Sequence, residues 1–194
     1  VSSAFPTGTL IIAIEFDNSQ NLWALNDKDK MFKVKQDGTV TTYDFTGNLR
    51  ALRIFNGDLY VAALKNNIEG VWRIPITGNG DLGTEELYFD LTGLRSNEPK
   101  ITAMTFAADG DMIIGLDKGP DPLLVVKPNQ SYEDLYPGVI GANSVISMYW
   151  PYNSNSLYFV RGEELNNDAT PKIIVSQITL RVEMEKPGAA YYGQ

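Results

Sequence analysis

The feature that most constrains this chain is a hairpin phrase that occurs four times. In each copy, a turn rich in Asp, Asn, Gly or Ser leads into a strand that opens with a polar residue, continues with an apolar one and then carries an aromatic or apolar one. The copies begin 37, 53 and 45 residues apart, near the period of propellers and solenoids. Their sequences are Asn21-Leu22-Trp23, Asp58-Leu59-Tyr60, Asp111-Met112-Ile113 and Ser156-Leu157-Tyr158. The chain is therefore predicted to stack repeats that each contain a hairpin.

Strand patterns fill nearly the whole sequence, and no long window carries the apolar stripe of an amphipathic helix. The second strand of each unit, such as residues 59–64, is apolar on both faces, so both faces should be covered. An immunoglobulin-like sandwich fits less well because it buries one face of each sheet. We predict an all-β chain, a β-propeller of four-stranded antiparallel blades.

Four blades are expected within a single propeller domain or propeller segment that covers residues 1–194. Their approximate bounds are residues 10–45, 49–91, 101–137 and 145–185. In the fourth blade, the outer strand is expected in the segment that ends at Glu185. Four-bladed rings are scarce, so the chain is expected to be part of a larger, six-bladed ring; the alternative is a closed ring in which residues 9–12 or the tail complete the last blade.

Composition excludes several classes of function. A net charge of −8 disfavours a nucleic-acid surface, which needs clustered Lys and Arg. The chain has no Cys and no His, which removes disulfides, thiolate or imidazole zinc sites and Ser-His-Asp catalysis. No apolar run is long enough for a membrane-spanning helix.

One blade carries a resemblance to a known family. The phrase that runs from Phe16 to Trp23, followed by Phe-Lys-Val-Lys-Gln-Asp-Gly-Thr-Val at residues 32–40, resembles a blade of the NHL-type or gluconolactonase-like bacterial β-propellers. The resemblance implies the fold and identifies blades, not an activity. Lactonase-like propellers hold a central cation with Glu, Asn and Asp from inner strands; Glu15 and Asn48 are the matching positions, but the third and fourth inner strands offer no acid.

Loops that follow the second strand of each blade carry the most polar chemistry. Equivalent loops of a propeller project to one rim, where loops on a rigid scaffold commonly bind ligands. Ordinary solvated turns are the other reading of the same residues. The candidate ligand-binding residues of these loops are Asn26, Asp27, Lys65, Asn66, Asp117, Lys118 and Arg161.

Aromatic residues offer a second route to recognition. Trp150 and Tyr152 lie at a strand end, where flat rings could stack on sugars or on peptide side chains. Packing in the core or in a turn is the alternative for each of them. No cofactor is expected, and calcium is the cation to test because carboxylates, amides and carbonyls are hard ligands.

The function predicted from these patterns is a non-catalytic binding or scaffold module that recognises a protein or a glycan through rim loops. The lack of His and of a complete carboxylate set favours binding over catalysis. We expect an exported protein, located in the periplasm, at the cell surface or outside the cell. The alternative is a cation-dependent lactonase or hydrolase that uses Glu15 and Asn48, with part of its site outside this chain.

Overall fold

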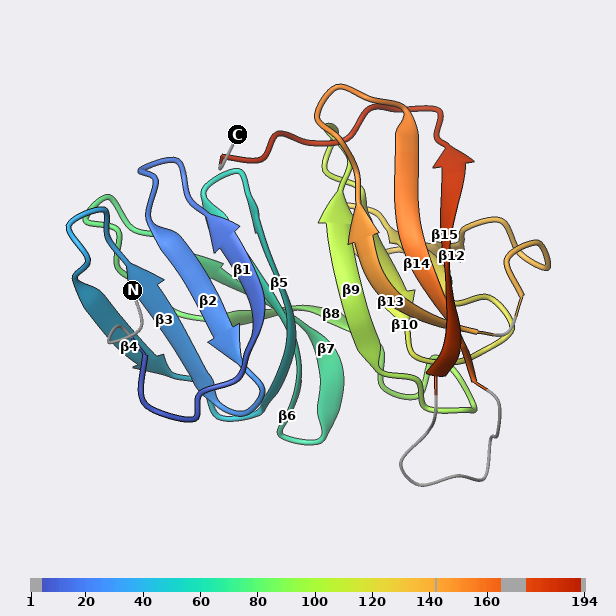
Figure 1. The fold of residues 1–194 in the computed structure, drawn as a ribbon. Coiled ribbons are helices and arrows are strands. Elements are labelled where there is room, and N and C mark those ends of the chain that lie inside the picture. The colour runs from blue at the N-terminus through green and yellow to red at the C-terminus, as the bar shows by residue number, and fades with distance from the viewer. Residues whose placement is uncertain (1–4, 142, 165–173, 193–194) are drawn as a thin grey trace. The chain divides into compact units, whose positions relative to one another are not determined.

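The computed structural model describes residues 5–141, 143–164 and 174–192, and these residues form antiparallel strands without a helix (Figure 1). The all-β prediction is confirmed. The described part of the chain accordingly contains no helix that could cross a membrane. The chain divides into two compact units, one that ends at Thr92 and also includes Tyr191 and Tyr192, and one that consists of Gly93–Ala190.

The N-terminal unit contains two four-stranded sheets, each a simple meander in which sequence neighbours pair. The first sheet consists of β1 (Ile11–Phe16), β2 (Leu22–Asn26), β3 (Lys30–Val34) and β4 (Val40–Asp44). The second consists of β5 (Asn48–Phe55), β6 (Asp58–Lys65), β7 (Ile68–Pro75) and β8 (Glu86–Asp90). These bounds agree with the predicted first and second blades.

The C-terminal unit contains one four-stranded and one three-stranded meander. The first consists of β9 (Ile101–Phe106), β10 (Met112–Leu116), β11 (Leu123–Val126) and β12 (Tyr132–Asp134). The second consists of β13 (Ser144–Tyr149), β14 (Ser156–Glu164) and β15 (Ile174–Glu183). The expected fourth strand near residue 185 is wrong: no turn interrupts the chain after Leu180, so β15 continues and pairs with β14 as far as Glu183.

The repeated phrase has a clear structural role in the first sheet. The Asp17 carboxylate lies in the turn after β1 and accepts four hydrogen bonds of 2.9 Å, two from the backbone N–H groups of Ser19 and Asn21, one from the Asn21 side chain and one from the Trp23 indole. Asp side chains stabilise turns in this way because they can bond the backbone two residues on. One carboxylate thus fixes both the turn and the largest core side chain of β2.

The polar residue that opens the second strand also joins it to the third strand. In the second sheet, Arg73 on β7 donates to Asp58 at 2.6 Å. In the third, Lys127 donates to Asp111 at 3.0 Å. In the fourth, the Ser156 hydroxyl donates to Glu183 at 3.1 Å. The polar position of the phrase is therefore a cross-strand link in these three sheets.

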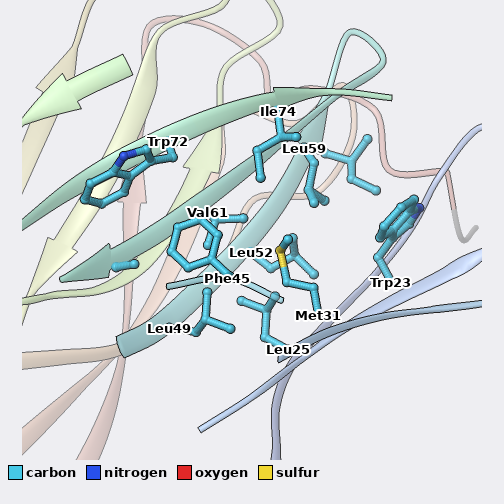
Figure 2. Close-up of a cluster of buried hydrophobic side chains, with 12 residues drawn as sticks. Trp23, Leu25, Met31, Phe45, Leu49, Leu52, Leu59, Val61, Trp72 and Ile74 are labelled. Carbon is cyan, nitrogen blue, oxygen red and sulfur yellow. The ribbon is translucent and has the colours of Figure 1, made fainter. Parts of the chain in front are cut away.

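The core of the N-terminal unit lies between its two sheets, whose side chains interdigitate (Figure 2). Trp23, Leu25 and Met31 come from the first sheet, and Leu59 and Val61 come from the middle of the second. β6 is buried over five consecutive residues, and all of β10 is buried, so the prediction that second strands are covered on both faces is confirmed for the first three sheets. It is wrong for β14, where buried and half-buried residues alternate over residues 156–160. Burial of this kind contributes about 1.5–3 kcal/mol for each large apolar side chain.

The core of the C-terminal unit depends on a close approach between its two sheets. A Cβ added at Gly115 on β10 would lie 2.5 Å from Cγ1 of Val145 on β13, so the sheets can approach this closely only because residue 115 has no side chain. Trp150, Leu157 and Phe159 fill the space beside this contact.

Candidate functional site

A groove of about 440 Å³ lies in the N-terminal unit, between its two sheets and beside the loop that precedes β8. Its apolar floor consists of Met31, Phe45, Ile74 and Leu82. Its polar rim includes Asp44, Thr46, Lys65, Thr84 and Glu85. Among the predicted site residues, Lys65 is the one that lines this groove.

The turn between β2 and β3 is fixed against the chain that enters the second sheet. Asn26 is buried, and its side-chain oxygen accepts hydrogen bonds from the backbone N–H groups of Lys28 at 3.0 Å and Lys30 at 2.8 Å. The backbone N–H of Phe45 donates to the Asp29 carbonyl at 2.8 Å. Asn26 therefore orders the turn beside the groove, and its amide oxygen is already engaged.

Lys65, at the end of β6, closes one side of the groove. Its ammonium group pairs with Glu85 and lies 4.5 Å from the centre of the Phe45 ring. The connection beneath it needs a glycine, because a Cβ at Gly47 would lie 2.8 Å from the Leu64 carbonyl oxygen. The Lys65 ammonium group is therefore held over the Phe45 ring and next to the Glu85 carboxylate on the rim of the groove.

Acidic groups lie on and next to the rim of the groove. Asp44 is exposed and pairs with Lys30, and the hydrogen bond that Lys30 donates to Asp44 raises the Lys30 pKa. The Tyr43 hydroxyl donates to Asp81 at 3.3 Å, and its pKa is raised, first by burial and then by the Asp81 charge. The rim therefore carries two carboxylates, Asp44 and Glu85, each paired with a lysine, above an apolar floor.

A buried lysine anchors a loop that lines the groove, and the sequence analysis did not single it out. Lys33 on β3 donates to the Gly80 carbonyl, lies 3.7 Å from Asp81 and lies 5.8 Å from the centre of the Trp23 ring. Lysine side chains are almost never fully buried, so nothing in the local pattern marks Lys33 as buried.

The predicted rim residues of the C-terminal unit hold connecting segments in place. Asp117 accepts a hydrogen bond from the backbone N–H of Lys100 at 2.7 Å. Arg161 on β14 donates to the Ile140 carbonyl at 2.7 Å. Lys118 is half-buried beside Asp117. In the N-terminal unit, Asp27 and Asn66 are exposed turn residues. A ligand-binding role for these residues stays a prediction.

Of the two candidate stacking aromatics, only Tyr152 is exposed. Its exposed fraction is 61%. Trp150 is 0% exposed, and its indole N–H donates to the Ser154 carbonyl at 2.8 Å. The expectation of an exposed ring at residue 150 is wrong because the strand end turns this side chain into the core, where it packs with Leu157 and Phe159.

The two candidate metal ligands lie at opposite ends of their strands. Glu15, near the end of β1, is 8% exposed and pairs with Arg53 on β5. Asn48 begins β5, five residues before Arg53, which corresponds to about 16 Å along a strand. Burial raises the Glu15 pKa, against the opposing effect of the Arg53 charge. Within the described residues, no group of three acidic side chains is placed to hold a metal ion.

Comparison with solved structures decides the fold. A gluconolactonase-like protein is 12% identical, with a TM-score of 0.67 over 92% of this chain and 59% of its own. Virginiamycin B lyase from Staphylococcus aureus is 16% identical, with a TM-score of 0.56 over 92% and 57%. The chain has the fold of a β-propeller. The resemblance to gluconolactonase-like propellers is thus confirmed for the fold.

A third protein of similar structure is PorZ, a surface component of the type-IX secretion system of Porphyromonas gingivalis. It is 16% identical, with a TM-score of 0.55 over 90% of this chain and 28% of its own. This β-propeller chain spans less than two thirds of the length of each of the three proteins. No family profile and no curated protein matches the sequence.

Proposed function

We propose that this β-propeller chain is a non-catalytic binding module that holds a segment of a partner protein in the groove beside Lys65. The observation that carries the proposal is the groove itself, with Met31, Ile74 and Leu82 in its floor and charged side chains on its rim. Apolar floors with a few placed polar groups are typical of binding sites in proteins. Lys65 and Glu85 would exchange their mutual pair for polar groups of the bound segment.

The groove favours a protein over a glycan because its two aromatic residues are already engaged by neighbouring side chains. Phe45 is buried beneath Lys65, and the Tyr43 ring stacks on Trp23 with 5.7 Å between ring centres. Sugars commonly bind through the open face of an aromatic ring. The exposed Tyr152, in the C-terminal unit, remains the position through which a glycan would be recognised.

The alternative, a cation-dependent lactonase-like enzyme, has less support in these residues. The chain has no His to act as a general base. Glu15 is already neutralised by Arg53, and Asn48 lies at the other end of its strand. Residues from outside this chain would have to supply most of such a site.

Export is part of the proposal. PorZ is a bacterial surface component, and the extracellular domain of BT3049 from Bacteroides thetaiotaomicron also resembles this chain, with a TM-score of 0.57 and 12% identity. These likenesses support a periplasmic, surface or extracellular location.

The experiment is a selection of displayed 12-residue peptides on the wild-type protein, followed by calorimetric titration of the selected peptides. Lys65→Ala should weaken their binding by roughly tenfold, about 1.4 kcal/mol. Lys35→Ala is the matched control, because Lys35 is an exposed lysine outside the groove, and it should leave binding unchanged. The proposal fails if no peptide is selected, or if the two variants bind equally well. Sugar binding on a glycan array that Tyr152→Ala abolishes would assign recognition to glycans instead.

A further inference from the structure

A second hollow, of about 240 Å³, lies in the C-terminal unit between β10–β12 and the segment that follows β15. Its apolar lining comes from Ile113, Val125, Leu135 and Met184, with Tyr136 beside them. Its charged lining consists of Asp111, Lys127, Glu133, Glu185 and Lys186. Pockets for drug-sized ligands are about 300–1,000 Å³, so this one is of a size for a single extended side chain.

The wall contributed by residues 184–189 is held in place by hydrogen bonds to both sheets of the unit. The Ala108 N–H donates to the Pro187 carbonyl at 2.9 Å, and the Gly188 N–H donates to the Ser154 carbonyl at 3.0 Å. The Tyr136 hydroxyl donates to the Glu183 carbonyl at 2.7 Å. Because these hydrogen bonds already hold the wall in place, a ligand would not have to pay the entropic cost of ordering it.

Most charges of the pocket are already paired with one another. The Asp111 carboxylate, 6% exposed, lies between the ammonium groups of Lys127 and Lys186. Lys127 also contacts Glu133 at 2.9 Å. Glu185 differs from them, because it is exposed and makes no ion pair with another described residue. Three carboxylates and two ammonium groups leave the lining with an excess of negative charge.

We propose that this pocket receives an arginine or lysine side chain of a partner polypeptide. The aliphatic stem would lie on Ile113, Val125 and Leu135, and the positive head group would reach Glu185 beside the face of the Tyr136 ring. Long basic side chains bind in this manner because they combine an apolar stem with a charged end. The net charge of −8 favours a basic partner. The inference rests on the proposed function only in that the partner is a protein. The pocket itself is separate from the groove beside Lys65.

Methionine methyl groups allow both sites to be observed in one experiment. The chain has five Met residues; Met184 lines this pocket and Met31 lines the groove of the N-terminal unit. The protein is labelled with 13C at the methionine methyl groups and titrated with the capped tripeptide Ala-Arg-Ala. The matched probe is Ala-citrulline-Ala, which keeps the shape of the side chain and removes its charge.

The arginine peptide should shift the Met184 signal in a saturable manner. The citrulline peptide should need an at least about fivefold higher concentration to reach half-saturation, which corresponds to about 1 kcal/mol of binding free energy. Glu185→Gln should weaken the binding of the arginine peptide by roughly threefold to tenfold, and the remaining affinity should depend less on salt concentration than that of the wild type. Glu98→Gln is the matched control, since Glu98 is an exposed acid of the same unit that does not line the pocket. It should change nothing.

Equal binding of the two peptides would overturn the proposal, because the charge would then play no part. An unchanged Met184 signal up to about 10 mM arginine peptide would also overturn the proposal, because even weak side-chain binding is visible at this concentration. The proposal that the groove binds a peptide is tested separately: it fails if the Met31 signal does not respond to the peptides selected by display. The two proposals therefore stand or fall on different signals.

Discussion

Tyr191 covers Arg53 in the N-terminal unit, with 3.8 Å between the guanidinium carbon and the centre of the ring, while Arg53 pairs with the buried Glu15. Gln20 donates to the Tyr192 carbonyl at 2.6 Å and holds the same tail segment. The end of the described chain thus packs on β5 and on the turn between β1 and β2, and the Tyr191 ring covers an ion pair.

Removing this ring should destabilise the N-terminal unit. Tyr191→Ala takes away a cation–π contact and exposes the Arg53–Glu15 pair, so we expect a loss of about 1–2 kcal/mol in the free energy of unfolding. Chemical denaturation followed by tryptophan fluorescence measures this loss. The control is Tyr152→Ala, an exposed ring, which should cost less than about 0.5 kcal/mol. Equal stabilities of the two variants would contradict the role given to Tyr191.

The turn formed by Asp17 leads to a second prediction. Asp17→Ala leaves the buried indole N–H of Trp23 without its acceptor and removes three further hydrogen bonds, so we expect a loss of about 2–4 kcal/mol. Asp37→Ala is the comparison, since Asp37 is exposed and accepts a hydrogen bond from the nearby Thr39 N–H at 2.8 Å, with no link to a buried side chain. That variant should lose less than about 1 kcal/mol by the same denaturation assay. Similar losses for both would show that the link to Trp23 adds nothing.

Asp17 also illustrates how much of the fold can be read from the sequence. A turn acid followed by an apolar strand is a local pattern, and strands that are apolar on both faces, such as β6 and β10, indicate cover on both sides. The sheets were predictable for these reasons. The outer strand expected to end at Glu185 is wrong, because β15 continues to Glu183 without a turn that would separate a further strand from it.

The candidate site was less predictable because it depends on contacts between residues that are distant in sequence. Lys65 was recognised as a rim residue, but the groove needs Leu82 and Glu85 from a loop that carries no motif. The burial of Lys33 follows from its bond to Gly80, which lies 47 residues away. Trp150 was read as exposed because a strand end followed by Pro151 is compatible with either a rim or a core position.

A third prediction concerns Gly188, where the segment after β15 passes the core. A Cβ at this position would lie 2.7 Å from Cγ of Trp150 and 2.8 Å from the Pro151 carbonyl oxygen. Gly188→Ala should therefore cost about 1–3 kcal/mol through overpacking, measured by thermal unfolding. Gly78→Ala is the control, since open space surrounds Gly78. A Gly188→Ala protein as stable as Gly78→Ala would contradict this placement of the segment.

A fourth prediction concerns alkaline pH. Burial, followed by the neighbouring Tyr88, raises the pKa of Tyr60 to about 12. Tyrosine in the unfolded chain ionises near pH 10, about two units lower. Because the folded state holds this proton more tightly, the contribution of Tyr60 to stability is complete below pH 10 and is lost as the pH rises toward 12.

The measurement is the free energy of unfolding between pH 9 and about 12. Wild-type protein should lose stability more steeply over this range than Tyr60→Phe, which has no hydroxyl to ionise. Tyr152→Phe, a change at an exposed ring, should follow the wild-type curve. Parallel curves for wild type and Tyr60→Phe would show that Tyr60 ionises normally in the folded protein.

The last prediction separates the binding module from the cation-dependent alternative. Calcium at about 5 mM should change the melting temperature by less than about 1 °C, because Glu15 is already paired with Arg53 and Asn48 lies a strand length away. A site with a Kd of about 0.1 mM would instead add about 2 kcal/mol, which raises the melting temperature of a chain this long by about 4 °C or more. Scanning calorimetry with calcium and with a chelator measures the difference. A rise of several degrees that Glu15→Gln abolishes would establish a cation site at Glu15, and the function would then have to be sought among cation-dependent hydrolases.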